Sequence, residues 1–385
     1  MRKKNYPLLD LCRLPAALLV IAIHISPLAA ISGTGDFILT RIIARIGVPF
    51  FIMITGYFIL PSRSRFFDQW PRLISEVKKC ALFYIIAILL YLPVNIYAGQ
   101  LPLWTSRGTL DPWWFLRLVK WLFIDGTFYH LWYFPALIMG LVLTGLLLSR
   151  FSHKTVMILA AFLYLLGLMG DSYFGLTEKI PGISQIYDGI FTVSTYTRNG
   201  LFYVPLFLML GRDLQIRRSH AKTTASFLFA GGALILMTGE GLILHHFHLQ
   251  RHDSMYLFLP LVMYSLFNGL SRAGLNLGSR PEGRARGKRR FALLGKITLV
   301  IYVIHPMVII ALRGGDRLLG LNGRLSSNNL LMYFFTCTLS LIFAVFFWLI
   351  VKKAGAILRS SFKKKNVWRQ NTQGASHTSK RRGSL

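Results

Sequence analysis

Residues 9–24 read LDLCRLPAALLVIAIH and open the first of a series of long apolar segments. About 20 consecutive apolar residues are enough to cross a bilayer as a helix. Of the 385 residues, 54% are apolar and only 15% are charged, which argues against a soluble or disordered chain. The sequence therefore predicts an all-α fold, a polytopic transmembrane bundle of about ten helices. The expected spans lie near residues 12–31, 38–60, 80–98, 130–149, 155–170, 192–211, 224–244, 255–271, 291–312 and 328–351.

The charged residues are strongly biased toward one side of this predicted bundle. The chain has 44 Lys and Arg against 14 Asp and Glu, a formal charge of +30. Nucleic-acid-binding proteins can be this basic, but they lack repeated apolar runs of membrane length, so we expect no nucleic-acid partner. If the N-terminus lies inside, 31 of the 44 basic residues fall in inside segments and 8 in outside segments. By the positive-inside rule, both termini are expected in the cytoplasm.

Two further segments complete the expected organisation. Residues 1–351 form one membrane domain, and residues 352–385 form a basic, polar tail that we expect to be disordered and to touch anionic lipid. Residues 112–124 are rich in Trp and Phe but contain Arg117 and Lys120, which predicts an interfacial helix and not a span.

The first apolar segment carries two ionisable residues, Arg13 and His24, eleven positions apart. Eleven helical steps of about 100° bring both side chains to the same face, about 16 Å apart along the axis. A guanidinium suits phosphate oxygens, and an imidazole can take a proton from a hydroxyl near neutral pH. Taken singly, Arg13 also fits a flanking residue whose head group reaches the interface, and His24 a hydrogen-bonded core histidine. Their common face favours a functional site.

Other polar residues are expected near the same outer depth. The second segment begins with Arg41, interpreted as an interface anchor, and with Arg45, expected to meet an acid or an anionic substrate group. His130 and His305 lie in the outer halves of their segments. Pro306 leaves a backbone carbonyl free that is expected to orient the ring of His305. An interfacial role for His130 and a structural role for His305 are the alternatives.

Several remaining features are less specific. The run HHFHLQRHD at residues 245–253 lacks a thiolate or acidic cluster, so no metal site is predicted. Glu240 is the one acid inside a predicted span and is a possible counter-ion of Arg45 or Arg198, with a paired structural role favoured. Three separated cysteines predict no disulfide framework, and the common motifs of soluble enzymes are absent.

The pattern of Arg13 and His24 in LDLCRLPAALLVIAIH resembles the acyltransferase-3 family. VPFFIMITGYF resembles that family's second-helix signature. LLGKITLVIYVIHP resembles its late helix, with Thr298 where serine is usual. Residues 1 to about 315 are similar to the membrane domain of VanT-type vancomycin-resistance serine racemases. The strings RIGVPFF, YHLWYFPALI, GDSYFGL, TRNGLFYVPLFLMLG and RHDSMYLFLP carry this likeness. Because only a basic tail follows here, we expect no racemase activity.

The resemblance implies a bacterial plasma-membrane enzyme that moves an acyl group, expected to be acetyl, from acyl-CoA to a hydroxyl of an extracytoplasmic sugar or envelope glycan. It implies no bound cofactor, with His24 as the catalytic base and Arg13 as its partner. The expected substrate-binding residues are Arg45, His130, Tyr133, Arg198, Asp253 and His305. The alternative hypothesis is a transporter for L-serine or a similar small amino acid, in which the same polar residues form a midplane site.

Overall fold

The computed structural model describes residues 6–60, 70–101, 112–217, 222–277, 284–318, 320 and 327–354. The described residues form helices and turns without any strand, which confirms the predicted all-α class. Among them, seven helices are long and apolar enough to cross a membrane. They are α1 (Pro7–Ile25), Gly33–Ile59, α4 (Trp70–Tyr97), α6 (Tyr133–Arg150), α11 (Thr223–His246), Leu293–Leu318 within α13 (Arg284–Leu318), and Asn329–Ala354.

The other three predicted spans are shorter or more polar helices. They are α7 (His153–Met169), α10 (Val204–Arg217) and α12 (Leu259–Leu277). α10 begins well after the predicted start at residue 192, because polar side chains fix the preceding segment as turns. The Asn199 Oδ1 accepts hydrogen bonds from the backbone N–H groups of Leu201 and Phe202, each at 3.0 Å. The predicted tail boundary at residue 352 lies within the last helix, and residues 355–385 lie outside the described part.

The second span is interrupted near its start. It consists of α2 (Gly33–Phe37), a π-helical turn at Ile38–Ile42, a 3₁₀ turn at Ile43–Ile46 and α3 (Gly47–Ile59). π-Helical turns inside longer helices often occur at functional sites. This irregular segment carries Arg41 and Arg45, so it sets the direction of both guanidinium groups.

Direct backbone contact joins α3 to α10. A Cβ atom on Gly56 would overlap the carbonyl of Leu208, and one on Gly211 would overlap the carbonyl of Met53. Small residues allow this approach in membrane helices, where packing and not a hydrophobic driving force holds helices together. The contact holds α3 close against α10.

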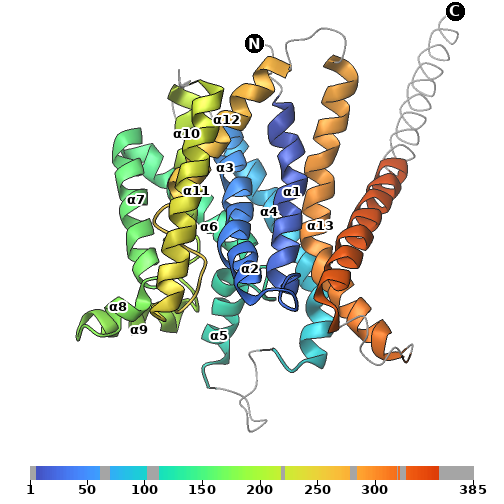
Figure 1. Cartoon of the computed structure of the whole chain (residues 1–385), viewed down its shortest axis with the longest axis horizontal. Coiled ribbons are helices and arrows are strands. Elements are labelled where there is room, and N and C mark those ends of the chain that lie inside the picture. The colour runs from blue at the N-terminus through green and yellow to red at the C-terminus, as the bar shows by residue number, and fades with distance from the viewer. Residues whose placement is uncertain are drawn as a thin grey trace, which may run out of the picture.

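α1 occupies the middle of the bundle. It packs against α3, α12 and α13 (Figure 1). The helix Asn329–Ala354 adds an outer layer, in which Tyr333 donates to the Leu18 carbonyl at 3.3 Å and Asn329 to the Ser26 carbonyl at 3.0 Å. Large apolar side chains on its outer face and on those of α4, α7 and α11 are exposed, as expected for lipid contact.

Short helices close one end of the bundle, opposite the N-terminal end of α1 (Figure 1). They are α5 (Trp114–Lys120), the π-helical turn Trp121–Asp125, α8 (Phe174–Thr177) and α9 (Ile183–Val193). The helix expected within residues 112–124 is therefore present. We refer below to the Arg13 end and the His24 end of α1.

Candidate active site

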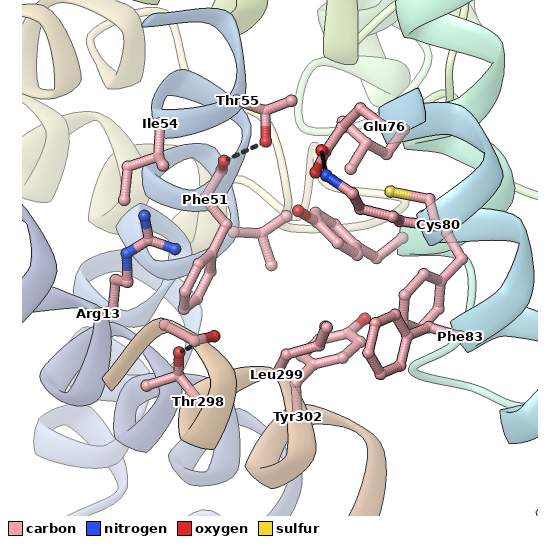
Figure 2. Close-up of a pocket in the computed structure, with 16 residues that line it drawn as sticks. Arg13, Phe51, Ile54, Thr55, Glu76, Cys80, Phe83, Thr298, Leu299 and Tyr302 are labelled. Carbon is pink, nitrogen blue, oxygen red and sulfur yellow. Dashed lines mark hydrogen bonds and ion pairs between the residues drawn. The ribbon is translucent and has the colours of Figure 1, made fainter. Parts of the chain in front are cut away.

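A cavity of about 210 Å³ lies beside the first turns of α1. Its walls come from α1, α3, α4, α6 and α13, with Arg13 on one side and Glu76 and Cys80 of α4 across from it (Figure 2). Most of the remaining lining is apolar, so the cavity suits a chain that is largely uncharged and carries an anionic group near Arg13. The apolar lining residues are Val48, Phe51, Ile54, Phe83, Phe134, Leu137 and Leu299.

The Arg13 guanidinium is held at the cavity edge. Its Nε lies 3.2 Å from Oδ1 of Asp10, and the two side chains are 21% and 27% exposed. α13 makes room for it with Gly295, where a Cβ atom would lie 3.0 Å from the Arg13 Nη1. The guanidinium is thus oriented by a carboxylate and placed at the boundary of the open volume.

Three histidines meet near the other end of α1. The His24 ring stacks on the His305 ring with centroids 5.4 Å apart, and the His130 ring meets His305 edge-on at 5.3 Å. The Tyr129 ring packs on the His24 ring, with ring centroids 4.7 Å apart. His130 and His305 are buried. Arg13 and His24 therefore share the face of α1 that packs on α13, and the three histidines that the sequence placed at similar depth form one cluster.

The orientation of His305 gives its two nitrogen atoms different roles. Its Nδ1 lies 3.2 Å from the carbonyl oxygen of Ile301. A carbonyl oxygen only accepts, so Nδ1 carries the hydrogen and Nε2 keeps its lone pair. This Nε2 is buried and has no hydrogen-bond partner. Pro306 has no backbone N–H, so it leaves the Tyr302 carbonyl without its usual helical donor. The carbonyl that orients the His305 ring is the preceding one, that of Ile301.

Tyr91 binds the backbone of α13 on both sides of Pro306. Its hydroxyl donates to the Val303 carbonyl at 2.7 Å and accepts from the backbone N–H of Met307 at 3.2 Å. Tyr91 is fully buried and also packs its ring 5.1 Å from His130. One tyrosine thus contacts both the Pro306 region of α13 and the histidine cluster.

Tyr302 connects the cavity with the histidines. Its side chain lines the cavity, its ring lies 5.6 Å from the His130 ring, and its hydroxyl donates to the His130 carbonyl. Tyr133, which the sequence analysis places among the substrate-binding residues, lies in the cavity wall together with Arg13, 5.3 Å from Tyr302 between ring centroids.

A second polar group forms around Asp253, in the connection between α11 and α12. Its carboxylate pairs with Arg45 and, at 3.2 Å, with Arg41. The Arg45 side chain is only 6% exposed, whereas Arg41 is 45% exposed. The expected partnership of Arg45 with an acid is present. Arg41 lies against this acid as well, a contact that its interpretation as an interface anchor did not include.

Arg198 belongs to the same region through Ser254. Its Nη1 donates to the Ser254 Oγ at 3.3 Å, and its guanidinium lies 4.5 Å from the Tyr196 ring centroid and 4.9 Å from that of Trp132. The Ser254 Oγ lies 2.5 Å from the Nδ1 of His252. We call Arg41, Arg45 and Arg198 the cationic cluster. Asp253, His252 and Ser254 connect its members.

Asp171 supports this loop from beneath. Its Oδ1 accepts hydrogen bonds from the backbone N–H groups of Ser254 at 2.8 Å and Met255 at 3.0 Å. Burial raises the pKa of Asp171 to about 7, despite these hydrogen bonds. Burial and the nearby guanidinium groups lower the pKa of His252 well below its ordinary range. Near neutral pH Asp171 is therefore only partly ionised, so it adds less than a full negative charge to that of Asp253.

Two sequence interpretations need correction or completion. Glu240 is not ion-paired with Arg45 or Arg198, and it has instead the structural role that the sequence analysis favoured. It accepts from the Tyr173 hydroxyl at 2.9 Å and from the backbone N–H groups of Leu257 and Phe258 at 2.6 and 3.2 Å, so it ties α11 to the following loop. In the run 245–253, His245 stacks on Phe37 with ring centroids 4.1 Å apart, and no metal-binding group of three or more side chains occurs among the described residues.

Sequence reasoning missed several residues that complete these groups. Tyr302 lies three positions before His305 on the same helical face, a spacing that could have predicted its proximity. Asp171 stands in the quoted string GDSYFGL, but its pairing with the loop 252–255 depends on tertiary contacts that no spacing indicates. The contributions of Tyr91 and Tyr129 likewise depend on how helices pack.

The chain is thus a helical membrane bundle with a guanidinium beside a cavity and a buried histidine cluster. Its sequence also matches a known protein family. The acyltransferase domain of the acyltransferase-3 family matches residues 6–349, so the chain belongs to that family of membrane proteins.

Particular relatives are racemases of enterococci. An amino-acid racemase of Enterococcus faecalis is 35% identical over 344 residues, which are 89% of this chain and 45% of the relative. A serine/alanine racemase of Enterococcus gallinarum is 38% identical over 351 residues, 88% of this chain and 45% of the relative. The chain thus spans less than half the length of these relatives. No solved structure matches it.

Proposed function

We propose that this protein is a membrane-bound O-acyltransferase that moves an acyl group, in the simplest case acetyl, from acyl-CoA to a hydroxyl of an extracytoplasmic sugar or envelope glycan. The donor enters at the Arg13 end and the acceptor at the His24 end. One observation carries the proposal: the Arg13 cavity and the His24 cluster lie along the same face of α1, with Tyr302 in contact with both.

In the proposed reaction, His24 takes the proton of the acceptor hydroxyl. The acceptor oxygen then attacks the thioester carbonyl, an ester bond forms, the carbon–sulfur bond breaks, and the thiolate receives the proton to leave as CoA. His305 holds the His24 ring by stacking. The donor set suits acyl-CoA in two respects, since Arg13 offers a fork for phosphate oxygens and the cavity offers an apolar slot for the thioester-bearing arm.

The proposal includes an orientation in a bacterial plasma membrane with both termini in the cytoplasm. The bias of Lys and Arg supports it, because the Arg13 end then opens toward the cytoplasmic pool of acyl-CoA. Reporter fusions at the two termini test this orientation. Both are expected to report a cytoplasmic location, and an external location of either would overturn it.

The test of the reaction uses the full chain in membrane vesicles with labelled acetyl-CoA and isolated envelope glycan. His24→Ala is expected to reduce transfer by about 10²–10⁴-fold, the usual contribution of a general base. His246→Ala is the matched control, because His246 is exposed and outside the cluster. Unimpaired transfer by His24→Ala, with membrane amounts equal to those of the control, would refute the mechanism.

A second candidate function is transport of L-serine or a similar amino acid. The observation in its favour is the interrupted span at residues 38–46, which directs Arg45 toward Asp253 inside the bundle. Broken helices of this type line substrate sites in transporters. The names of the racemase relatives agree with an amino acid as ligand. Uptake of labelled serine into vesicles, without label transfer from acetyl-CoA, would favour this function over acyl transfer.

A further inference from the structure

The cationic cluster holds more positive charge than its immediate neighbours neutralise. Arg41 and Arg45 share the single carboxylate of Asp253, and Arg198 contacts a neutral hydroxyl, that of Ser254. The nearest other acid, Asp171, directs Oδ1 to two backbone N–H groups. Three guanidinium groups therefore face one carboxylate that is free of backbone hydrogen bonds.

Two of these guanidinium groups also have unused hydrogen-bond donors. The Nε atoms of Arg45 and Arg198 are buried and have no hydrogen-bond partner within the described residues. The Arg45 side chain is 6% exposed. A buried charged donor without a partner is destabilising, so natural proteins seldom keep one unless a ligand or an ordered water completes it.

The position of the cluster links it to the acceptor side. Arg198 lies 4.9 Å from the ring centroid of Trp132, which follows His130 of the histidine cluster by two residues. None of the three arginines lines the cavity beside Arg13. A group bound here would thus lie near the proposed base and apart from the proposed donor site.

We propose that the cationic cluster binds an oxyanion, a carboxylate or a phosphate, that belongs to the acyl acceptor. The acceptor is then a hydroxyl compound that carries an anionic group, and not a neutral sugar. The statement that the bound oxyanion belongs to an acyl acceptor rests on the proposed function. The existence of the anion site is argued from the geometry alone. Guanidinium groups fit both kinds of oxyanion through paired N–H···O bonds, so the chemistry shared by the two is what the site recognises.

Three small probes separate the possibilities: glycerol, glycerate and glycerol 3-phosphate, which share a three-carbon hydroxyl skeleton and differ in their anionic group. Binding to the purified full chain is measured by calorimetry in detergent. One or both of the charged probes are expected to bind at least about tenfold more tightly than glycerol, as charge-assisted hydrogen bonds predict. A preference between glycerate and glycerol 3-phosphate identifies the source of the oxyanion as a carboxylate or a phosphate.

The informative variant is Arg198→Gln, because Asp253 keeps both of its guanidinium partners in it. The preference for the charged probe is expected to fall about tenfold or more, and Arg198→Lys is expected to restore part of it. Arg251→Gln is the control, since this exposed arginine lies on Phe191 and donates to the Thr195 carbonyl, outside the cluster. If Arg198→Gln does not fold, Arg41→Gln removes the most exposed cation of the cluster, leaves Asp253 paired with Arg45, and is expected to show the same loss.

Equal affinity of the wild-type protein for the three probes would overturn the anion site, as would an unchanged preference in Arg198→Gln. His24→Ala separates this inference from the proposed function. It is expected to lose acyl transfer while it keeps the preference for the charged probe. Transfer to a neutral glycan that is as efficient as transfer to its anionic counterpart would refute the acceptor assignment.

Discussion

Around Arg13 the bundle leaves a cavity of about 210 Å³ with a guanidinium and a Glu–Lys pair at its edge, whereas around His24 rings pack against rings. The charged side chains at the Arg13 end are partly exposed. At the His24 end, His130 and His305 are buried, and both nitrogen atoms of His130 and the Nε2 of His305 have no hydrogen-bond partner in the described part of the chain.

The two regions are therefore suited to different parts of the reaction. The Arg13 end has an open cavity and a guanidinium that attracts an anion, but few directed hydrogen-bonding groups. The His24 end has directed groups and little room. If the chain is an acyltransferase, changes at the Arg13 end are expected to alter the KM for the donor, and changes at the His24 end are expected to alter kcat.

After the loss of His24 itself, the largest effect is expected from His305→Ala at the His24 end. Loss of the stacked ring leaves His24 without its support, so kcat for acyl transfer should fall by about 100-fold, at the lower end of general-base effects. The KM for acetyl-CoA should stay within twofold of the wild-type value. Steady-state kinetics in vesicles measures both constants.

Two comparisons make that result specific. His305→Asn can still donate to the Ile301 carbonyl and is expected to recover part of the rate, whereas exposed His246→Ala should have no effect. A raised donor KM with unchanged kcat in His305→Ala would contradict the division between the two ends.

The next prediction tests whether the donor occupies the cavity, by means of a substitution that fills it. Val48→Trp places a large ring in the lining of the cavity and occupies volume that the donor would need. The KM for acetyl-CoA is therefore expected to rise by about tenfold or more, a loss of about 1.4 kcal/mol or more of binding free energy. Val142→Trp is the control, because Val142 is on the exposed face of α6. Equal kinetics of the two variants would show that the donor does not use this volume.

A smaller effect is expected from the charge pair at the cavity edge. Glu76 and Lys79 lie 3.2 Å apart with side chains 25% and 62% exposed. Because an acyl-CoA donor is anionic, Glu76→Gln should lower its KM and Lys79→Gln should raise it. Each change should be about twofold to fivefold, the range that exposed charge pairs allow. Both effects should shrink in high salt. Shifts in the same direction for the two variants would argue against an anionic donor in this cavity.

The fold class and the core of the candidate site could be predicted from local sequence rules. Apolar length alone predicted the all-α bundle, and helical periodicity predicted that Arg13 and His24 share a face. The start of α10 was predicted too early, at residue 192, although the polar run TYTRNG at residues 195–200 interrupts the apolar segment there. The side chain of Asn199 holds this run as turns.

The partners of the charged residues were the least predictable part. Glu240 was considered as a counter-ion because it is the one acid in a predicted span, yet Asp253, from a loop, pairs with Arg45. That pairing joins residues 208 positions apart in the chain. Contacts between residues so far apart depend on the path of the loops between helices. Residue type and helical periodicity carry no information about that path.

The smallest expected effect concerns the pH dependence of stability and tests the charge near the His24 end. Burial raises the pKa of Asp171 from its ordinary 3.8 to about 7, so the folded protein retains a proton that the unfolded chain releases between these values. The unfolding free energy from this group is then largest below the unfolded pKa and declines as the pH rises through about 7. The neighbouring His252 does not titrate in this window, because its own pKa is lowered well below its ordinary range.

Asp171→Asn keeps an oxygen that accepts from the backbone N–H groups of Ser254 and Met255 but has no proton to lose. Between pH 6 and pH 8, the Tm of the wild-type protein in detergent should fall by about 1–2 °C more than that of the variant, as about 1 kcal/mol predicts for a chain of 385 residues. Tryptophan fluorescence during heating measures both proteins at each pH. Parallel pH profiles would mean that Asp171 stays ionised in the folded protein, and the cationic cluster would then face a second full negative charge, which would weaken the preference for an anionic acceptor.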